Sequence, residues 1–114
     1  MDTTARLHVD GADVAEVIVA DTYLRRLRGM LWRNPLPPAL VLTRTTSVHG
    51  IGMRHALDVA VLDAEGTVLK VAVLRPWGLT GAVKHGRQVL EAPVGSFRQW
   101  DLGPGTRVEV TAPS

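Results

Sequence analysis

The chain has no cysteine among its 114 residues. Disulfide bonds, thiolate metal sites and cysteine nucleophiles are therefore excluded within it. Aromatic residues are also scarce, at 4% of the chain, so aliphatic residues have to supply most of a hydrophobic core. Lysine is nearly absent, because Lys70 and Lys84 are the only lysines among thirteen basic residues and the rest are arginine. Arginine recognises carboxylates and phosphates through its planar guanidinium.

Long apolar runs are absent too. No run approaches the roughly 20 residues that a membrane span needs, so we expect no membrane span. Residues 1–6 lack the basic and then apolar pattern of a signal peptide, so we expect a cytoplasmic location. The net charge of +2 is small and the aromatic residues are too dispersed to form a base-stacking surface, which argues against a nucleic-acid partner.

Short apolar segments separated by turn residues predict a mainly β chain. A length of 114 residues is typical of one domain, so we expect residues 1–114 to form a single domain. Alternating or β-branched patterns predict strands at residues 6–9, 14–20, 39–42, 57–62, 67–74, 88–92 and 107–110. The clearest hairpin joins 57–62 to 67–74, because Gly66 between them suits the left-handed position of a tight turn.

Two helical segments interrupt these strands. Leucines at helical spacing predict a helix over residues 23–32, whose arginines largely point away from the apolar face. Residues 96–100 predict a single helical turn that the Ser96 hydroxyl could cap. The predicted fold class is therefore α+β, a compact, mainly β, barrel-like mixed sheet with one helix in the N-terminal half and a short helical turn near the C-terminus.

The densest chemistry lies in residues 47–58, which carry two histidines, an arginine, a methionine and an aspartate beside two glycines. The glycines allow the backbone to turn sharply or to approach another segment closely. His49, His55 and Asp58 are residue types that bind zinc, iron or nickel, so a metal-dependent hydrolase is one open alternative. The simpler interpretation is a surface loop whose histidines form local hydrogen bonds.

Asp58 opens a strand that is otherwise apolar. If it is buried, its carboxylate needs an arginine, such as Arg28 or Arg54, or backbone amides as partners. Acid–base chemistry by paired carboxylates would require Asp58 to meet Glu91, which the sequence does not determine. There is no nucleophilic serine elbow, phosphate-binding glycine loop or dinucleotide motif, so we assign no catalytic residue and favour a protein that is not an enzyme.

Five short motifs follow one another along the chain. They are Ala20-Asp21-Thr22, Arg28-Gly29-Met30-Leu31-Trp32-Arg33, Val48-His49-Gly50-Ile51-Gly52-Met53-Arg54, Leu57-Asp58-Val59-Ala60-Val61-Leu62-Asp63 and Val89-Leu90-Glu91-Ala92-Pro93-Val94-Gly95. In this order they resemble the family called domain of unknown function 192, over about residues 14–110. The resemblance implies a small, mainly β domain with no established activity.

The resemblance also implies which residues are characteristic of the family. Its polar and glycine positions fall on Arg28, Gly29, Arg33, Met53, Asp58, Glu91 and Gly95. The chain has Gly52 where many members have an aromatic residue, and Arg54-His55 where an asparagine often follows, like a histidine-containing branch of the family. An architectural interpretation stays open: glycines for turns, methionine for the core and carboxylates for buried pairing.

We therefore expect a non-catalytic module whose small polar groove binds a small anionic ligand or a protein segment. The expected ligand-binding residues are Arg28, Arg33, His49, Met53, Arg54, Asp58 and Glu91. No metal or cofactor is assigned, and we expect a monomer or a weak homo-oligomer. Two alternatives remain: the hydrolase, and a structural partner in a larger assembly, which an exposed apolar patch around Trp77 or Trp100 would favour.

Overall fold

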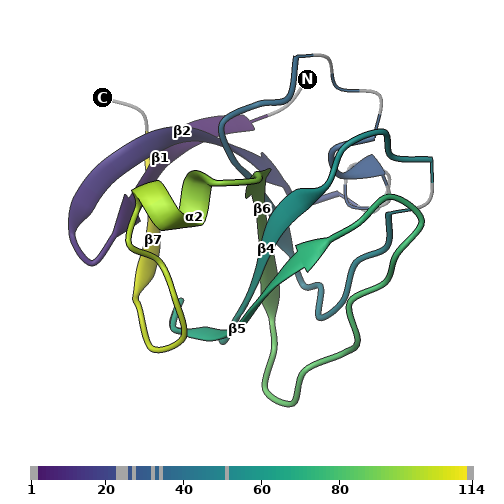
Figure 1. The fold of residues 1–114 in the computed structure, drawn as a ribbon. Coiled ribbons are helices and arrows are strands. Elements are labelled where there is room, and N and C mark those ends of the chain that lie inside the picture. Colours follow the sequence, from purple (N-terminus) through teal and green to yellow (C-terminus); the bar gives the residue numbers. More distant parts are fainter. Residues whose placement is uncertain are drawn as a thin grey trace.

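The computed structural model describes residues 3–22, 26, 28–31, 33, 35–50 and 52–112. The strands are β1 (Thr3–Val9), β2 (Ala12–Ala20), β3 (Leu40–Thr43), β4 (Leu57–Leu62), β5 (Val68–Leu74), β6 (Gln88–Pro93) and β7 (Val108–Thr111). They form one seven-stranded sheet in the order β5-β4-β6-β3-β2-β1-β7 (Figure 1). A short helix, α2 (Ser96–Gln99), follows β6.

The sheet is mixed, as the sequence predicts. β2 and β3 are parallel, whereas every other pairing of neighbouring strands is antiparallel. β5 and β7 stand at the two ends of the strand order, and an isolated bridge joins Thr67 to Arg107 beside them. One bridge is not a ladder between two strands, so the barrel-like part of the prediction is not confirmed.

Two tight turns explain the hairpins. Asp10 and Gly11 between β1 and β2 both have left-handed backbone, with φ of 47° and 85°, as a two-residue hairpin turn of type I′ requires. Between β4 and β5, Gly66 has φ of 87°, and Oδ1 of Asp63 accepts hydrogen bonds from the amides of Glu65 and Thr67. The predicted hairpin of residues 57–62 and 67–74 is thereby confirmed.

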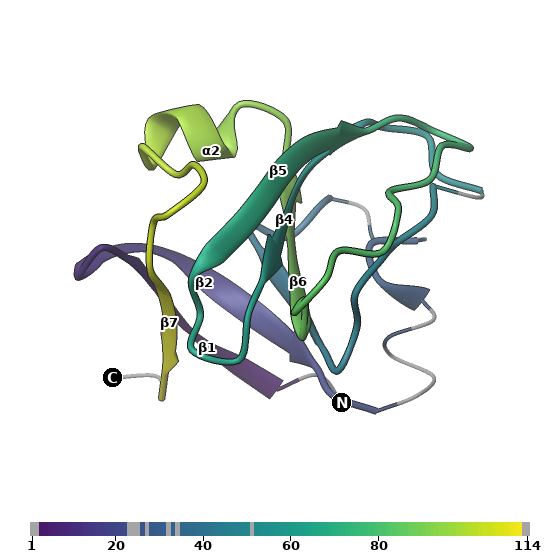
Figure 2. The same ribbon diagram turned by 90° about the horizontal axis from the view of Figure 1, so that it is seen from below.

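The central strands β4 and β6 are covered on both faces. On one side, the α2 face, Ala60, Leu62, Leu90 and Ala92 pack in a cluster with Phe97 of α2. On the opposite side, the loop face, Leu57, Val59, Val61 and Val89 pack in a second cluster with Met30 and Val48. The two views agree that α2 and the long loop after β5 lie at opposite sides of β4 (Figures 1 and 2). Burial on both faces explains why β4 is a nearly continuous apolar run.

The predicted helix over residues 23–32 lies partly outside the described residues. Arg26 and Arg28 have helical backbone, and the Arg26 amide donates a hydrogen bond of 2.9 Å to the carbonyl of Thr22. The turn then ends at Gly29, which has φ of 51°. In the described ranges, no helix has the length and apolar character that crossing a membrane requires.

The short helical turn near the C-terminus is confirmed as α2, but its predicted cap is wrong. Gly95 is the N-cap residue, in left-handed backbone, and no side chain of the turn itself makes a cap hydrogen bond. Instead, Oδ2 of Asp58 on β4 accepts from the amides of Gly95 and Phe97, at 3.0 and 3.1 Å. A carboxylate from a distant strand replaces the local serine because α2 packs directly against the end of the sheet.

Candidate ligand-binding site

Close backbone contacts hold residues 48–50 against the loop after β5. The Gly50 amide donates to the carbonyl of Gly78, and the Trp77 amide donates to the carbonyl of Gly50. A Cβ atom on Gly50 would lie 2.4 Å from the carbonyl oxygen of Arg75, so only glycine fits there. The side chain of Thr80 completes the attachment by bonding both the amide and the carbonyl of Val48.

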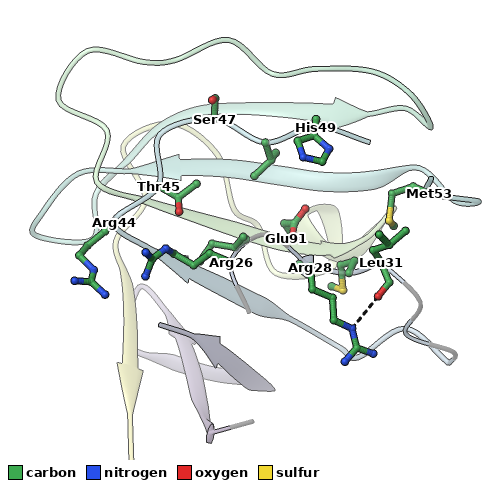
Figure 3. A pocket seen from close by; sticks show the side chains of 13 residues that line it. Arg26, Arg28, Leu31, Arg44, Thr45, Ser47, His49, Met53 and Glu91 are labelled. Atoms are coloured by element: carbon green, nitrogen blue, oxygen red, sulfur yellow. Dashed lines mark hydrogen bonds between the residues drawn. The ribbon is translucent and has the colours of Figure 1, made fainter. Parts of the chain in front are cut away.

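A cavity of about 300 Å³ opens between this attached segment, residues 26 and 28–31, and the loop face of the sheet. We call it the Glu91 pocket, after the carboxyl group that lines it from β6. Figure 3 shows Arg26 and Arg44 to one side of Glu91, with Met53 and Leu31 to the other. Apolar side chains supply much of the remaining wall: Met30, Leu42 and Val48.

Glu91 is the most unusual group in this pocket. Its residue is only 3% exposed, and its two partners across the sheet are the apolar Leu40 and Val59. Oε1 is buried and, in the part of the chain that the structure describes, accepts no hydrogen bond. Burial raises the pKa of Glu91 to about 7, because the charged form is poorly solvated there, and the Arg33 guanidinium opposes that shift.

Three arginines surround the same pocket, and backbone carbonyls hold them. Arg26 and Arg44 both donate to the carbonyl of Asp21, at 2.8 and 2.9 Å. Arg28 donates through Nε to the carbonyl of Leu31, at 3.0 Å. Over the described ranges, the ion pairs found join Arg6 to Asp13 and Arg107 to Glu109, so no carboxylate neutralises these three guanidinium groups.

A second cavity, of about 370 Å³, adjoins the first. Arg33, Arg54 and His55 line it, while Met30 and Met53 line both cavities. The two methionines therefore form the partition between the pockets. Thioether side chains have three rotatable bonds and fill irregular space, so this partition is well suited to adjust to an occupant.

The expected binding residues thus divide into three groups. Arg28, His49, Met53 and Glu91 line the Glu91 pocket. Arg33 and Arg54 line the second cavity. Asp58 lines neither cavity, because its side chain lies on the α2 face and caps α2.

Asp58 resolves two alternatives that the sequence left open. Its carboxylate is satisfied by backbone amides rather than by Arg28 or Arg54. It also cannot pair with Glu91 for acid–base chemistry, because β4 and β6 present the two carboxyl groups to opposite faces of the sheet. The register shows this directly: Asp58 pairs with Ala92 and Val59 pairs with Glu91.

The structure gives the metal alternative no support. His49 lines the Glu91 pocket, His55 lines the second cavity and Asp58 lies on the other face of the sheet. Across the residues with described positions, no group of three histidine, cysteine or acidic side chains is arranged to hold a metal ion.

Two arginines of the Glu91 pocket were missed by the sequence analysis. Arg26 belongs to the predicted helix of residues 23–32, whose arginines are expected to point away from its apolar face, and Arg44 directly follows β3. Arg44 has φ of 52°, a left-handed conformation that turns the chain away from the strand. Their shared partner, the carbonyl of Asp21, could not be recognised from spacing, since 23 residues separate Arg44 from it.

Comparison with known proteins finds a family model that matches residues 5–110. The family is DUF192, described as "Uncharacterized ACR". A UPF0127 protein from Pyrococcus abyssi is 34% identical over 99 residues, covering 82% of this chain and 85% of the relative. A UPF0127 protein from Pyrococcus furiosus is 31% identical with the same coverage of both chains.

Two crystal structures resemble the fold. One is a protein from Sinorhizobium meliloti described as a putative transcription regulator, with a TM-score of 0.82 and 19% identity over 96% of this chain and 95% of that one. The other is a protein of unknown function from Novosphingobium aromaticivorans, with a TM-score of 0.77 and 19% identity over 96% of this chain and 84% of that one. At this identity the similarity shows the shared fold alone.

Proposed function

Because this chain belongs to the DUF192 family, whose description assigns no activity, we propose a function from the site itself: a non-catalytic module that binds a small anionic ligand in the Glu91 pocket. The observation that carries the proposal is the set of three pocket arginines whose hydrogen bonds, among the described residues, go to carbonyl oxygens. A carbonyl fixes the position of a guanidinium but leaves its charge unbalanced. An anion in the pocket would therefore gain charge-assisted hydrogen bonds.

The shape of the pocket supports a small ligand. Its volume of about 300 Å³ lies at the lower end of the range for small-molecule sites. Apolar walls beside a few polar groups are also typical of such sites, since burial of apolar surface supplies affinity and the polar groups supply orientation. The second cavity, with Arg33 and Arg54, extends the positive surface beyond the methionine partition.

A thermal-shift survey of small carboxylates, phosphates and their uncharged analogues tests the proposal. We expect carboxylates or phosphates to raise the melting temperature of the protein, and the double variant Arg26→Ala/Arg44→Ala to lose that response. Arg98→Ala is the matched control, because Arg98 is an exposed arginine on α2 outside both cavities. If no anion stabilises the protein, or if the double variant responds like the control, the proposed function is wrong.

A second candidate, docking onto a protein partner, rests on a different observation. Trp77 and Leu79 are 70% and 73% exposed, in the loop that Gly50 contacts. Large exposed apolar side chains close in sequence are a feature of protein-binding surfaces. Trp100, by contrast, is partly buried and contacts Phe97 at a ring separation of 6.0 Å.

Native mass spectrometry of tag-free protein distinguishes three functions: anion binding, docking onto a protein partner and metal-dependent hydrolysis. The binding module predicts a small organic or inorganic anion as the retained mass, and docking predicts a second chain that Trp77→Ser removes. A stoichiometric metal ion would instead favour the hydrolase.

A further inference from the structure

An anionic ligand alone would supply neither a hydrogen-bond donor nor a positive charge to the buried carboxyl group of Glu91. A buried carboxyl oxygen without a donor costs free energy, and an ionised one costs more unless a cation or several donors face it. Within the described chain no such donor reaches Oε1 of Glu91, whose neighbours across the sheet are Leu40 and Val59. A cationic group of a ligand in the pocket would offset this cost.

The backbone of Gly29 lies close to the carboxyl group of Glu91. A Cβ atom at Gly29 would lie 3.0 Å from Oε1 of Glu91, so a side chain here would crowd the oxygen. Gly29 is followed by Met30 and preceded by Arg28, both of which line the same pocket. The chain thus brings to one cavity a guanidinium, an apolar wall and a buried carboxyl group whose Oε1 accepts no hydrogen bond from the described residues.

We propose that the ligand of the Glu91 pocket is a small zwitterion with an aliphatic body. Its ammonium group would face Glu91, its carboxylate would face the arginines, and its aliphatic part would contact Met30 and Leu42. An α-amino acid with an aliphatic side chain is the smallest common molecule with these three parts. The inference rests on the proposed function, which it narrows from anions in general to anions that also carry a cationic amine.

Each simpler ligand leaves one feature of the pocket unexplained. A plain carboxylate would meet the arginines but place no donor on Glu91. A plain amine would meet Glu91 but leave the charges of Arg26, Arg28 and Arg44 unbalanced. Only a molecule with both charges satisfies both ends, and a cation beside Glu91 also favours the ionised carboxylate over the protonated form that burial favours in the empty pocket.

Isothermal titration calorimetry with four probes tests the inference. L-leucine carries all three parts, 4-methylpentanoate lacks the amine, 3-methylbutylamine lacks the carboxylate, and 6-aminohexanoate separates the two charges. We expect one of the two zwitterions to bind at least about tenfold more tightly than both single-charge probes. Preference between leucine and 6-aminohexanoate reports how far apart the two charges sit in the pocket.

Variants of Glu91 and Arg44 test whether these residues cause the preference for zwitterions over single-charge probes. Glu91→Gln removes the charge but keeps the size of the side chain, so it should weaken the preferred zwitterion at least about tenfold and leave 4-methylpentanoate within about twofold. Arg44→Ala should weaken all three carboxylate-bearing probes and leave 3-methylbutylamine unchanged. Glu109→Gln, at an exposed position on β7, is the control and should change none of these affinities.

The outcomes distinguish this inference from the proposed function. If 4-methylpentanoate binds as tightly as the zwitterions, and Glu91→Gln does not change the difference between their affinities, the anion-binding function stands. The inference that the ligand is a zwitterion is then wrong. If neither zwitterion binds, the inference is overturned as well. The proposed function falls with it only when the wider survey of carboxylates and phosphates also finds no stabilising anion.

Discussion

Two buried carboxyl groups on neighbouring strands have opposite surroundings. Asp58 is 8% exposed and Glu91 is 3% exposed, so both are removed from water. Asp58 accepts two backbone amides at the start of α2, whereas Oε1 of Glu91 accepts no hydrogen bond across the described residues. The comparison shows that burial of a carboxylate does not by itself indicate a site. Asp58 has a structural partner, and Glu91 faces a cavity.

The difference follows from strand geometry. Asp58 and Val59 are consecutive on β4, and their partners Ala92 and Glu91 are consecutive on β6. Successive side chains point to opposite faces, so a shift of one position moves a carboxyl from the α2 face to the loop face. On the α2 face, the backbone amides at the start of α2 donate hydrogen bonds to Asp58. On the loop face, Glu91 is surrounded by apolar side chains and lines the Glu91 pocket.

Removal of the satisfied carboxylate should have the largest effect. Asp58→Ala leaves the amides of Gly95 and Phe97 without an acceptor, and we expect it to reduce the free energy of unfolding by about 3 kcal/mol. Urea denaturation measures this loss. Asp13→Ala breaks an exposed ion pair with Arg6 and should cost much less, because solvent screens that pair. Equal losses in the two variants would show that the cap is not structurally important.

Removal of the unsatisfied carboxyl group of Glu91 should instead raise the free energy of unfolding at high pH. The pKa of Glu91 is raised from 4.5 to about 7, so its contribution to stability is complete below about pH 4.5 and is lost as the pH rises through about 7. Glu91→Gln abolishes this dependence. At pH 8 we expect the variant to be more stable than the original chain by about 2 kcal/mol, because the neutral amide of glutamine avoids most of the cost of a buried, ionised carboxyl group.

Denaturation at pH 4 and at pH 8 checks this second prediction. The stability difference between Glu91→Gln and the original chain should be small at pH 4 and large at pH 8. A variant that is destabilised equally at both pH values would mean that Glu91 has a partner in the folded protein after all.

The smallest effect on stability is expected when a side chain at position 29 crowds Oε1 of Glu91. Gly29→Ala places a methyl group 3.0 Å from Oε1 of Glu91 and forces alanine into backbone with φ of 51°, which should cost about 1 kcal/mol. Gly81→Ala is the matched control, because a Cβ there meets no atom within 4 Å and its φ is not left-handed. Thermal unfolding compares the two, and identical melting temperatures would argue against the contact.

The sequence was a good guide to the strands. All seven predicted strand positions coincide with strands of the sheet, because alternation, β-branched residues and turn glycines are local signals. Gly66 shows the same, since glycine adopts left-handed backbone without a steric penalty. The cap of α2 could not be found in this way, because Asp58 lies 37 residues from Gly95 in the chain.

The candidate site was predictable only in part. Arg28, His49, Met53 and Glu91 were identified and do line one cavity, whereas Arg33 and Arg54 line its neighbour and Asp58 lines neither. Pattern alone could not determine which face of the sheet Asp58 and Glu91 occupy, since β4 and β6 are buried on both sides. Arg26 and Arg44 were missed because only the tertiary fold brings both to the carbonyl of Asp21.

The most direct test of the account is the titration of Glu91 itself. Carbon-13 NMR of the side-chain carboxyl group, recorded from pH 3 to pH 9 on the ligand-free protein, gives its midpoint without relying on any ligand. We expect a midpoint near 7, because the carboxyl group is buried and its Oε1 accepts no hydrogen bond from the described residues. A midpoint near the ordinary value of 4.5 would mean that Glu91 is solvated or paired, and would contradict the claim that the pocket presents an unsatisfied carboxyl group to a ligand.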